Sequence, residues 1–409
     1  MKYLSGLKRL ASSRAVKDTI YLSILMEAFF IGLSQTTAIV FMGIGIALFL
    51  LRWWKDPNFH VKRTTFHWPI IVYLLCSAAS ILVSPDKMYT LTIWFVLVVI
   101  YLLTYVLVTQ NMETPRQVRL LAYSLGASAA IIVAYGFFQF IFGIDTSEMK
   151  WVDGEAFPEL SKRVFSTLEN PNILAAYLDV VVCVLLGLFG TLSDKRLRIA
   201  IGVAMVCTLG CIAMTYARGA CLTIAVIMAG YGVLKDKRIL VAVAVLVAGF
   251  LLLNPVLFER MSTMFTVVDT SSEMRIAMWE STIQMILDHP LLGIGGGAYS
   301  LVYPIYDTYI VDGSVTLVHA HNIYLNYLAE IGIVGGCAFL VFFLGYTVTA
   351  LHPQKIMPDE FSKGLMLGLG LGLVSVALNG LTDDVLYNVP SSMLLWMICG
   401  LVYVMKEKI

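Results

Sequence analysis

Repeated apolar stretches of about 16 to 25 residues, separated by short charged links, run through most of the chain. A helix of this length can cross the hydrocarbon core of a bilayer. The composition agrees, because 59% of the 409 residues are hydrophobic and only 13% are charged. One water-soluble core cannot hold so much apolar surface. We therefore expect an all-α integral membrane protein with a single polytopic domain over residues 1–409.

The apolar stretches predict about twelve spanning helices. The first stretch has no small-residue cleavage site after it, so we expect a retained span rather than a signal peptide. The predicted spans are roughly 19–33, 36–52, 68–84, 89–109, 118–142, 172–191, 198–215, 219–234, 238–254, 322–348, 364–380 and 388–405.

Basic residues are distributed unevenly between the links. Most of the 28 Lys and Arg residues lie in one alternating set, which includes both chain ends. The positive-inside rule places this set, and therefore both termini, in the cytoplasm. The opposite set holds Lys87, Lys150, Lys162, Arg163, Arg218, Arg260 and Arg275.

Two long links, 143–171 and 255–321, fall on the predicted outer side, the larger one between spans nine and ten. Helix-to-helix links usually have ~2–8 residues, so these are longer than a simple connection needs. In the larger link, the pattern Thr270 to Glu273 is a capping box that predicts an amphipathic helix. We expect this helix to lie against the membrane surface or the mouth of the bundle. Its apolar positions are Ile276, Trp279, Ile283 and Ile286, and Pro290 with the following glycines would end it.

The run from Gly293 to Gly297 reads GIGGG, which resembles a phosphate-binding loop. It follows a helix rather than a strand and lacks the lysine of such loops. We therefore expect a tight turn in which one backbone segment approaches another.

Three basic residues of the outer links are candidates for binding an anion. Arg218 lies in a very short turn between two spans, where an arginine needs a partner or a function. Arg275 lies in the first turn of the predicted loop helix, and Arg163 precedes the span that begins near Asn170. Each could pair with a carboxylate or reach lipid headgroups. Two guanidinium groups at one membrane face also suit a diphosphate, which we favour for Arg218 and Arg275 and leave open for Arg163.

The segment VHAHNIYLNYLAEIGIVGG places His319, His321 and Asn322 at the start of an apolar run. His321 falls at the outer end of its span, where a neutral imidazole can act as a general base. A cap or a hydrogen-bonded core residue is the usual role of such a histidine, but the arginines on the same side favour catalysis. We expect His319 to point elsewhere. A metal site with nearby aspartates remains an alternative, but no ligand spacing supports it, so we predict no metal and no cofactor.

Polar residues near or within the spans have simpler expected roles. Asp383 and Asp384 could orient His321 or bind sugar hydroxyls, but we favour a solvated turn. Gly332, Gly335 and Gly336 would allow close helix packing. Charged groups within spans should make hydrogen bonds between helices; these are Glu27, Asp179 and Glu330. We expect all seven cysteines to be packing residues; they are Cys76, Cys183, Cys207, Cys211, Cys221, Cys337 and Cys399.

The spacing from His321-Asn322 through nine residues to Gly332, and two further residues to Gly335, resembles the O-antigen ligase and O-antigen polymerase family of bacterial envelope enzymes. The Arg-Gly of TYARGA, the element from Arg275 to Trp279 and the segment HPLLGIGGGAY are also similar to that family. The likeness covers roughly Arg163 to Gly336 together with the twelve-span layout.

This resemblance implies a metal-independent, inverting glycosyltransferase with a GT-C-like bundle in the bacterial inner membrane. Its active site would lie at the periplasmic face. Arg218 and Arg275 would bind the diphosphate of an undecaprenyl-diphosphate-linked glycan, and His321 would deprotonate the acceptor hydroxyl. The expected partners are this donor, a lipid A-core acceptor and the bilayer, without nucleic acid. Possible further substrate-binding residues are Arg163, Asn322, His319, Trp279, Asp383 and Asp384.

Three functions compete. We favour a ligase, which moves a finished polysaccharide onto lipid A-core. A polymerase, which joins repeat units on undecaprenyl diphosphate, needs the same diphosphate-binding groups and base. A transporter of lipid-linked sugars is the third, although we find no internal repeat of the kind that transporters often have.

Overall fold

A computed structural model describes residues 14–143, 163–253, 270–307, 317–352 and 357–409. These residues form helices, turns and links, without strands. The prediction of an all-α protein is therefore confirmed for this part of the chain. Much of the two predicted outer links, 144–162, 254–269 and 308–316, lies outside the described residues.

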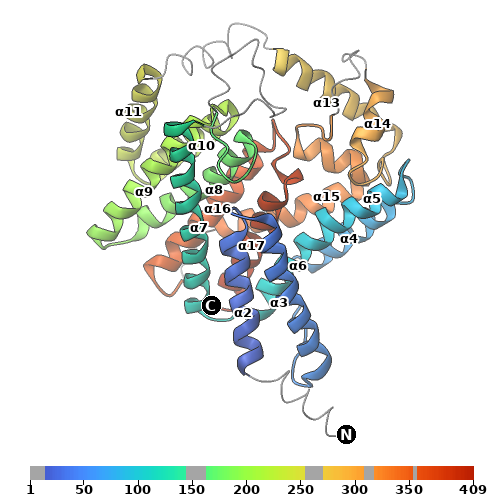
Figure 1. The fold of residues 1–409 in the computed structure, drawn as a ribbon, viewed down its shortest axis with the longest axis horizontal. Coiled ribbons are helices and arrows are strands. Elements are labelled where there is room, and N and C mark those ends of the chain that lie inside the picture. Colours follow the sequence, from blue (N-terminus) through green and yellow to red (C-terminus); the bar gives the residue numbers. More distant parts are fainter. Residues whose placement is uncertain (1–13, 144–162, 254–269, 308–316, 353–356) are drawn as a thin grey trace.

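Each of the twelve predicted spans coincides with a helix or a continuous helical run (Figure 1). Eight helical stretches of the described chain are long and apolar enough to cross a membrane, and the apolar helices α4 and α10 are shorter. The chain is thus a multi-pass membrane protein, while the number of twelve spans stays a prediction. The helices are α2 (Arg14–Phe30), α3 (Gln35–Lys55), α4 (His67–Ser80), the run α5–η1–α6 (Lys87–Trp94, Phe95–Val99, Ile100–Asn111), α7 (Pro115–Phe142), α8 (Pro171–Thr191), α9 (Lys195–Met214), α10 (Arg218–Leu234), α11 (Lys237–Leu253), α15 (Ile323–Leu351), α16 (Glu360–Asn379) and α17 (Val389–Glu407).

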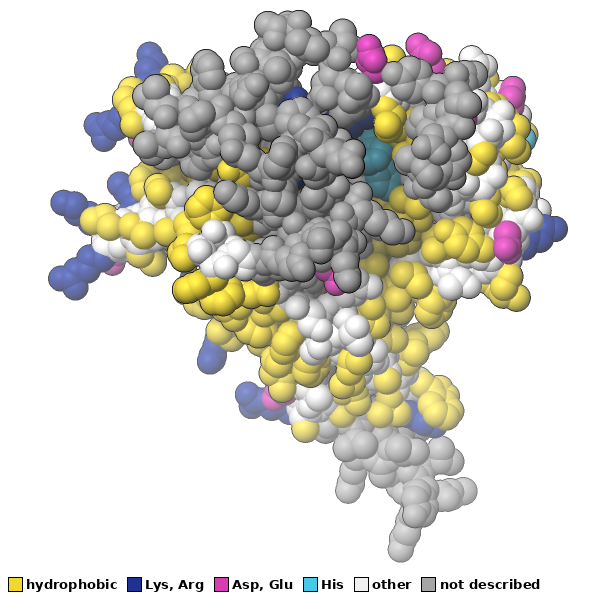
Figure 2. All heavy atoms as spheres, turned by 45° about the horizontal axis from the view of Figure 1, so that its top comes forward, with side chains coloured by type: hydrophobic (Ala, Val, Ile, Leu, Met, Phe, Trp, Pro, Cys, Tyr) yellow, Lys and Arg dark blue, Asp and Glu magenta, His cyan; other side chains and the backbone are white. Residues whose placement is uncertain are grey.

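Close helix packing builds the centre of the bundle. Gly187 of α8 faces α16 so closely that a Cβ there would lie 2.5 Å from the Gly368 nitrogen. Small residues allow this approach, which is common between membrane helices. α17 runs through the middle, and most of its side chains are buried. Hydrophobic side chains cover much of the lateral surface of the bundle (Figure 2).

The bundle has two chemically different ends. One end, which we call the site end, carries Asn172 at the start of α8 and His321 just before α15. The other, which we call the basic end, lies where α8 finishes. Several basic side chains gather there, including Lys62, which pairs with Glu113 at 2.8 Å, and Arg119, which pairs with Asp359 at 3.1 Å.

Polar groups inside the bundle make the expected contacts in two of three cases. Glu27 of α2 accepts a hydrogen bond from Thr104 of α6 at 2.5 Å, and Asp179 of α8 accepts one from Asn379 of α16 at 2.8 Å. Glu330 differs, because its carboxylate makes no hydrogen bond to another spanning helix among the described residues. Each of the three acids also has one buried oxygen without a hydrogen-bond partner there. All seven cysteines are free thiols. The packing role is wrong for Cys207 and Cys337, whose side chains lie on exposed faces.

The predicted loop helix is present as α13 (Thr270–Asp288), and a second short helix, α14 (Tyr299–Tyr306), follows it. Both lie over the site end, and α13 packs against α15 (Figure 1). They enclose a small apolar core of their own, formed by Met278, Met285, Ile294, Tyr299, Val302, Tyr303 and Ala320. Helix α13 therefore lies at the mouth of the bundle, one of the two positions expected from the sequence.

The glycine run makes the expected backbone-to-backbone contact. Ile294 and Gly295 donate their amide hydrogens to the carbonyls of Ala329 and Glu330 at 2.9 and 3.0 Å. These bonds require an opening in α15, which is provided by Gly332 with a φ of +75°. Gly332 thus kinks α15, and the glycine run packs against the kink. Close helix packing, the role that we expected for Gly332, belongs instead to Gly335, where a Cβ would lie 2.8 Å from that of Cys76 in α4.

Replacing Gly332 by alanine should lower the thermal unfolding temperature of the purified protein. An L-residue is strained at this φ, and its Cβ would collide with the Leu291 carbonyl, at a cost of about 1–3 kcal/mol. Gly43→Ala is the matched control, because Gly43 is helical and has open space around it. Equal unfolding temperatures for the two variants would contradict the described turn.

Candidate functional site

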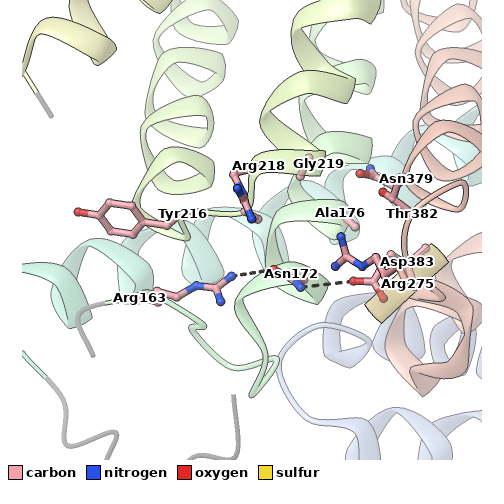
Figure 3. Close-up of a pocket in the computed structure, with 13 residues that line it drawn as sticks. Arg163, Asn172, Ala176, Tyr216, Arg218, Gly219, Arg275, Asn379, Thr382 and Asp383 are labelled. Atoms are coloured by element: carbon pink, nitrogen blue, oxygen red, sulfur yellow. Dashed lines mark hydrogen bonds between the residues drawn. The ribbon is translucent and has the colours of Figure 1, made fainter. Parts of the chain in front are cut away.

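A cavity of about 150 Å³ opens at the site end, between the starts of α8 and α10, the link that joins α16 to α17, and α13 above them (Figure 3). Its four charged residues, Arg163, Arg218, Arg275 and Asp383, are all ones that the sequence singled out. It is lined by Arg163, Asn172, Ala176, Tyr216, Ala217, Arg218, Gly219, Ala220, Arg275, Asn379, Thr382, Asp383 and Val385.

The start of α15 is fixed to the link after α16. The Asn322 side chain caps α15 by accepting hydrogen bonds from the amides of Tyr324 and Leu325, both at 3.0 Å. Its amide nitrogen donates to the Leu381 carbonyl at 3.0 Å, and the Ile323 amide donates to the Gly380 carbonyl at 2.9 Å. Since every polar atom of the buried Asn322 side chain is engaged, its role here is structural. The expectation that it binds substrate is not supported.

His321 and Asp383 form the central contact of the site. The His321 Nδ1 and Asp383 Oδ1 atoms are 2.9 Å apart, and both side chains remain partly exposed, at 32% and 21%. Burial alone would raise the pKa of Asp383. The hydrogen bond and charge of His321, together with His319 and Arg275, outweigh that effect and hold the pKa below its usual range. An ionised carboxylate can only accept, so His321 Nδ1 donates and Nε2 is left to accept a proton. The solvated-turn interpretation of Asp383 is therefore wrong.

His319 lies beside His321 instead of pointing elsewhere as expected. The two rings are 4.3 Å apart, and the His321 amide donates to His319 Nδ1 at 3.2 Å. The left-handed backbone of His321, with φ +47°, turns the chain back so that the rings can meet. Burial lowers the pKa of His319 to about 4, with the nearby His321 as the next cause. His319 is thus neutral at ambient pH, and its ring packs against the imidazole of His321.

Three side chains at this point could also gather a divalent cation. Ligand atoms of His319, His321 and Asp383 all lie within 4.8 Å of one another. Two imidazoles and a carboxylate are a familiar ligand set for transition metals. Of the two aspartates that lie near these histidines in the sequence, Asp307 contacts Tyr303 at the end of α14, and Asp312 lies outside the described residues. The absence of a metal in the reaction remains a prediction.

Arg218 and Arg275 reach the cavity from different elements. Arg218 is the first residue of α10, after the tight turn at Tyr216, whose φ is +54°. Arg275 comes from α13 and lies beside Asp383 (Figure 3). Two segments separated by a long link thus bring guanidinium groups to one cavity. The face that carries α13 and α14 shows histidine and basic side chains within a hollow (Figure 2).

A chain of hydrogen bonds runs from Arg163 to His321. Arg163 donates to the Thr215 carbonyl at 2.8 Å and to Asn172 Oδ1 at 2.7 Å. Asn172 in turn donates to Asp383 Oδ2 at 3.4 Å. Asn172 was missed by the sequence reasoning. The only signal was an asparagine in the first turn of a span, directly after the Asn-Pro that begins α8.

Two remaining candidates lie outside the cavity lining. Trp279 donates its indole N–H to the Ala320 carbonyl at 3.0 Å, so it holds the histidine segment and does not reach the cavity. Asp384 is buried and accepts the Leu386 amide at 3.2 Å, where it caps the short helix η3 (Val385–Tyr387). The expected solvated turn is therefore wrong for Asp384 as well, and substrate contact is not supported for either residue.

Comparison with known proteins identifies a family for part of the chain. The family model described as O-antigen ligase matches residues 203–340, a range that contains Arg218, Arg275 and His321. It ends before Asp383. The comparison with curated proteins gives no match for this chain. The resemblance inferred from the histidine spacing is thus confirmed.

Replacing Asp384 by asparagine should flatten the fall of stability with rising pH. Burial, followed by the charge of Asp383, raises the pKa of Asp384 to about 7. An unfolded aspartate ionises near pH ~3.9, so the folded state holds a proton that the unfolded chain has released. The contribution of Asp384 to stability therefore falls as the pH rises from about 4 to about 7 and is constant above that.

Thermal unfolding temperatures of the wild type and Asp384→Asn, measured across this interval, check this expectation. As the pH rises, the unfolding temperature of the variant should rise relative to that of the wild type, because asparagine keeps the acceptor for Leu386 but does not titrate. Asp236→Asn is the control, since Asp236 caps α11 through an oxygen that asparagine retains and lies on the surface. Parallel curves for the wild type and Asp384→Asn would contradict a raised pKa.

Proposed function

Because residues 203–340 carry the O-antigen ligase family domain, we propose that this protein is a glycosyltransferase of the bacterial inner membrane that uses a glycan on undecaprenyl diphosphate. We propose further that it is the ligase, with a sugar hydroxyl of lipid A-core as acceptor and the site at the periplasmic face. One observation carries the proposal: a cavity lined by Arg218 and Arg275 adjoins the hydrogen bond between His321 and Asp383.

The arginines suit the leaving group. Breaking the bond between the anomeric carbon and the diphosphate leaves negative charge on the phosphate oxygens. Guanidinium groups that already face the cavity can bind those oxygens in bidentate fashion and stabilise the charge as it develops. Because they come from α10 and α13, closing them around a diphosphate would also fix α13 over the bundle.

His321 can serve as the base that deprotonates the acceptor hydroxyl. Its Nε2 would take the proton of the acceptor hydroxyl while the hydroxyl oxygen attacks the anomeric carbon from the side opposite the diphosphate. The new glycosidic bond forms as the old carbon–oxygen bond breaks, and the configuration inverts. Asp383 would hold the imidazole in the required tautomer and stabilise its charged form once the proton has arrived.

Arg163 and Asn172 suit a positioning role. Through Asn172, the first outer link is connected to the same carboxylate that orients His321. Movement of Arg163 toward a bound anion would therefore shift Asn172 and, through it, Asp383.

The alternative function is the polymerase, because the groups named here could act on either acceptor.

His321→Ala should abolish glycan transfer in a deletion strain that is complemented with the variant. Loss of a general base typically costs about 10²–10⁴-fold in rate. A lipopolysaccharide gel gives the readout, and His352→Ala is the matched control, since His352 is exposed at the far end of α15.

The gel separates the competing functions. Loss of all polysaccharide bands, with long glycan accumulating on undecaprenyl diphosphate, supports the ligase. A core band that bears a single repeat means the polymerase. An unchanged ladder with folded His321→Ala protein contradicts both and favours a transporter.

Asp383→Asn should lower kcat by about 10²-fold or more while changing KM little. Asparagine fills the same space, but it neither stabilises the charged imidazole nor fixes the tautomer. Transfer by the purified protein gives kcat and KM separately. Asp236→Asn again serves as control, and a variant with wild-type kcat would remove Asp383 from the mechanism.

A further inference from the structure

A second cavity, of about 340 Å³, lies in the half of the bundle nearer the basic end. It is bounded by α7, α8, α9, α16 and α17, and apolar and aromatic side chains form its walls. Along α8 its lining runs from Tyr177 to Leu188, and it shares no residue with the lining of the arginine cavity. It is therefore separate from the site described above.

This cavity reaches the lateral surface of the bundle. Tyr123 of α7 and Leu197 of α9 line it, and their side chains are 55% and 46% exposed. Gly126 also lines the cavity, and it has open space where a Cβ would be. Apolar cavities of about 150 Å³ already stay dry and bind small hydrocarbons. In a bilayer, an apolar cavity that opens sideways faces the acyl chains of lipids.

The rim of the cavity carries an arginine with an unused donor. Arg119 pairs with Asp359 at 3.1 Å through Nη2, and its guanidinium lies 5.2 Å from the ring centre of Phe361, a lining residue. Its Nε is buried and has no hydrogen-bond partner among the described residues. The side chain as a whole is 41% exposed, so its other nitrogens are open to an oxygen acceptor at the rim.

The surroundings of Arg119 favour an anion. The helices α7, α9 and α16 all begin at this rim, and helix starts attract negative charge. Contacts hold the three starts together: Arg119 of α7 pairs with Asp359 before α16, and Ser193 before α9 bonds with Glu360 of α16. The N-caps and first five residues of these helices hold six basic side chains, Arg116, Arg119, Lys195, Arg196, Arg198 and Lys363, against three acidic ones, Asp194, Asp359 and Glu360.

We propose that this cavity binds one acyl chain of a membrane phospholipid with an anionic headgroup, whose phosphate lies at Arg119. The lipid would fill the space between α7 and α9 and link these helices to α16. The polyprenyl chain of the proposed donor fits less well. The arginine cavity takes in only Asn172 and Ala176 of α8, whereas most of this one lies further along the helix, from Val180 to Leu188, toward the basic end. The inference does not depend on the proposed function.

Native mass spectrometry of the full-length protein in mild detergent tests the proposal. The protein is supplied with phosphatidylglycerol or with phosphatidylcholine, and thermal unfolding is followed in the same mixtures. We expect one phosphatidylglycerol to stay bound and to raise the unfolding temperature more than phosphatidylcholine does. Wild-type protein without retained lipid, or with equal responses to both lipids, would overturn the proposal.

Two pairs of variants locate the site. Ala129→Phe fills the cavity and should lose both the bound lipid and the difference between the two lipids. Ala130→Phe adds the same ring to the exposed side of the same helix and should keep both. Equal lipid retention by these two variants would contradict binding in the cavity.

The second pair remains informative if Ala129→Phe does not fold. Arg119→Gln removes the cation, and Asp359→Asn breaks the same ion pair but leaves the cation in place. Only Arg119→Gln should lose the preference for phosphatidylglycerol. An unchanged preference in Arg119→Gln would place the headgroup elsewhere and overturn the proposal.

Discussion

The hydrogen bonds between the start of α15 and the link after α16 hold the candidate site together. The first turn of a helix has backbone donors without partners inside the helix, and near a membrane few water molecules are available to satisfy them. Asn322 meets part of this need and at the same time binds the link through Leu381. The same junction brings Asp383 to His321. One structural requirement of the helix start therefore also fixes the geometry of the candidate base.

The helices bring together residues that are far apart in the sequence. Close packing of α8 against α16 places Asn172 next to Asp383, and α13 carries Arg275 over the same point. The loop helix can do this because its small core and the glycine turn attach it to the kink at Gly332. The hydrocarbon-facing bundle thus serves as a rigid support for polar groups gathered at one end. At the other end, similar helix starts and basic residues frame an apolar cavity.

Sequence reasoning found the helices, because a stretch that is apolar over the thickness of a bilayer has few alternatives to a helix. It also singled out Arg218, Arg275 and His321, because charged residues beside spans are costly and therefore conspicuous; their roles stay a prediction. It failed for Asp383 and His319. Asp383 lies 62 positions from its partner, and apolar spacing gives no information on which links meet. His319 depends on the left-handed backbone of its neighbour, which nothing in the local sequence required.

The central claim is that the arginine cavity and the imidazole act together on a lipid-linked donor. The most direct measurement is the release of undecaprenyl diphosphate from an undecaprenyl-diphosphate-linked glycan by the purified protein in proteoliposomes, with lipid A-core as acceptor and a metal chelator present. The account predicts release that requires the acceptor and is lost in both His321→Ala and the double variant Arg218→Ala/Arg275→Ala. Acceptor-dependent release by either folded variant at the wild-type rate would contradict it.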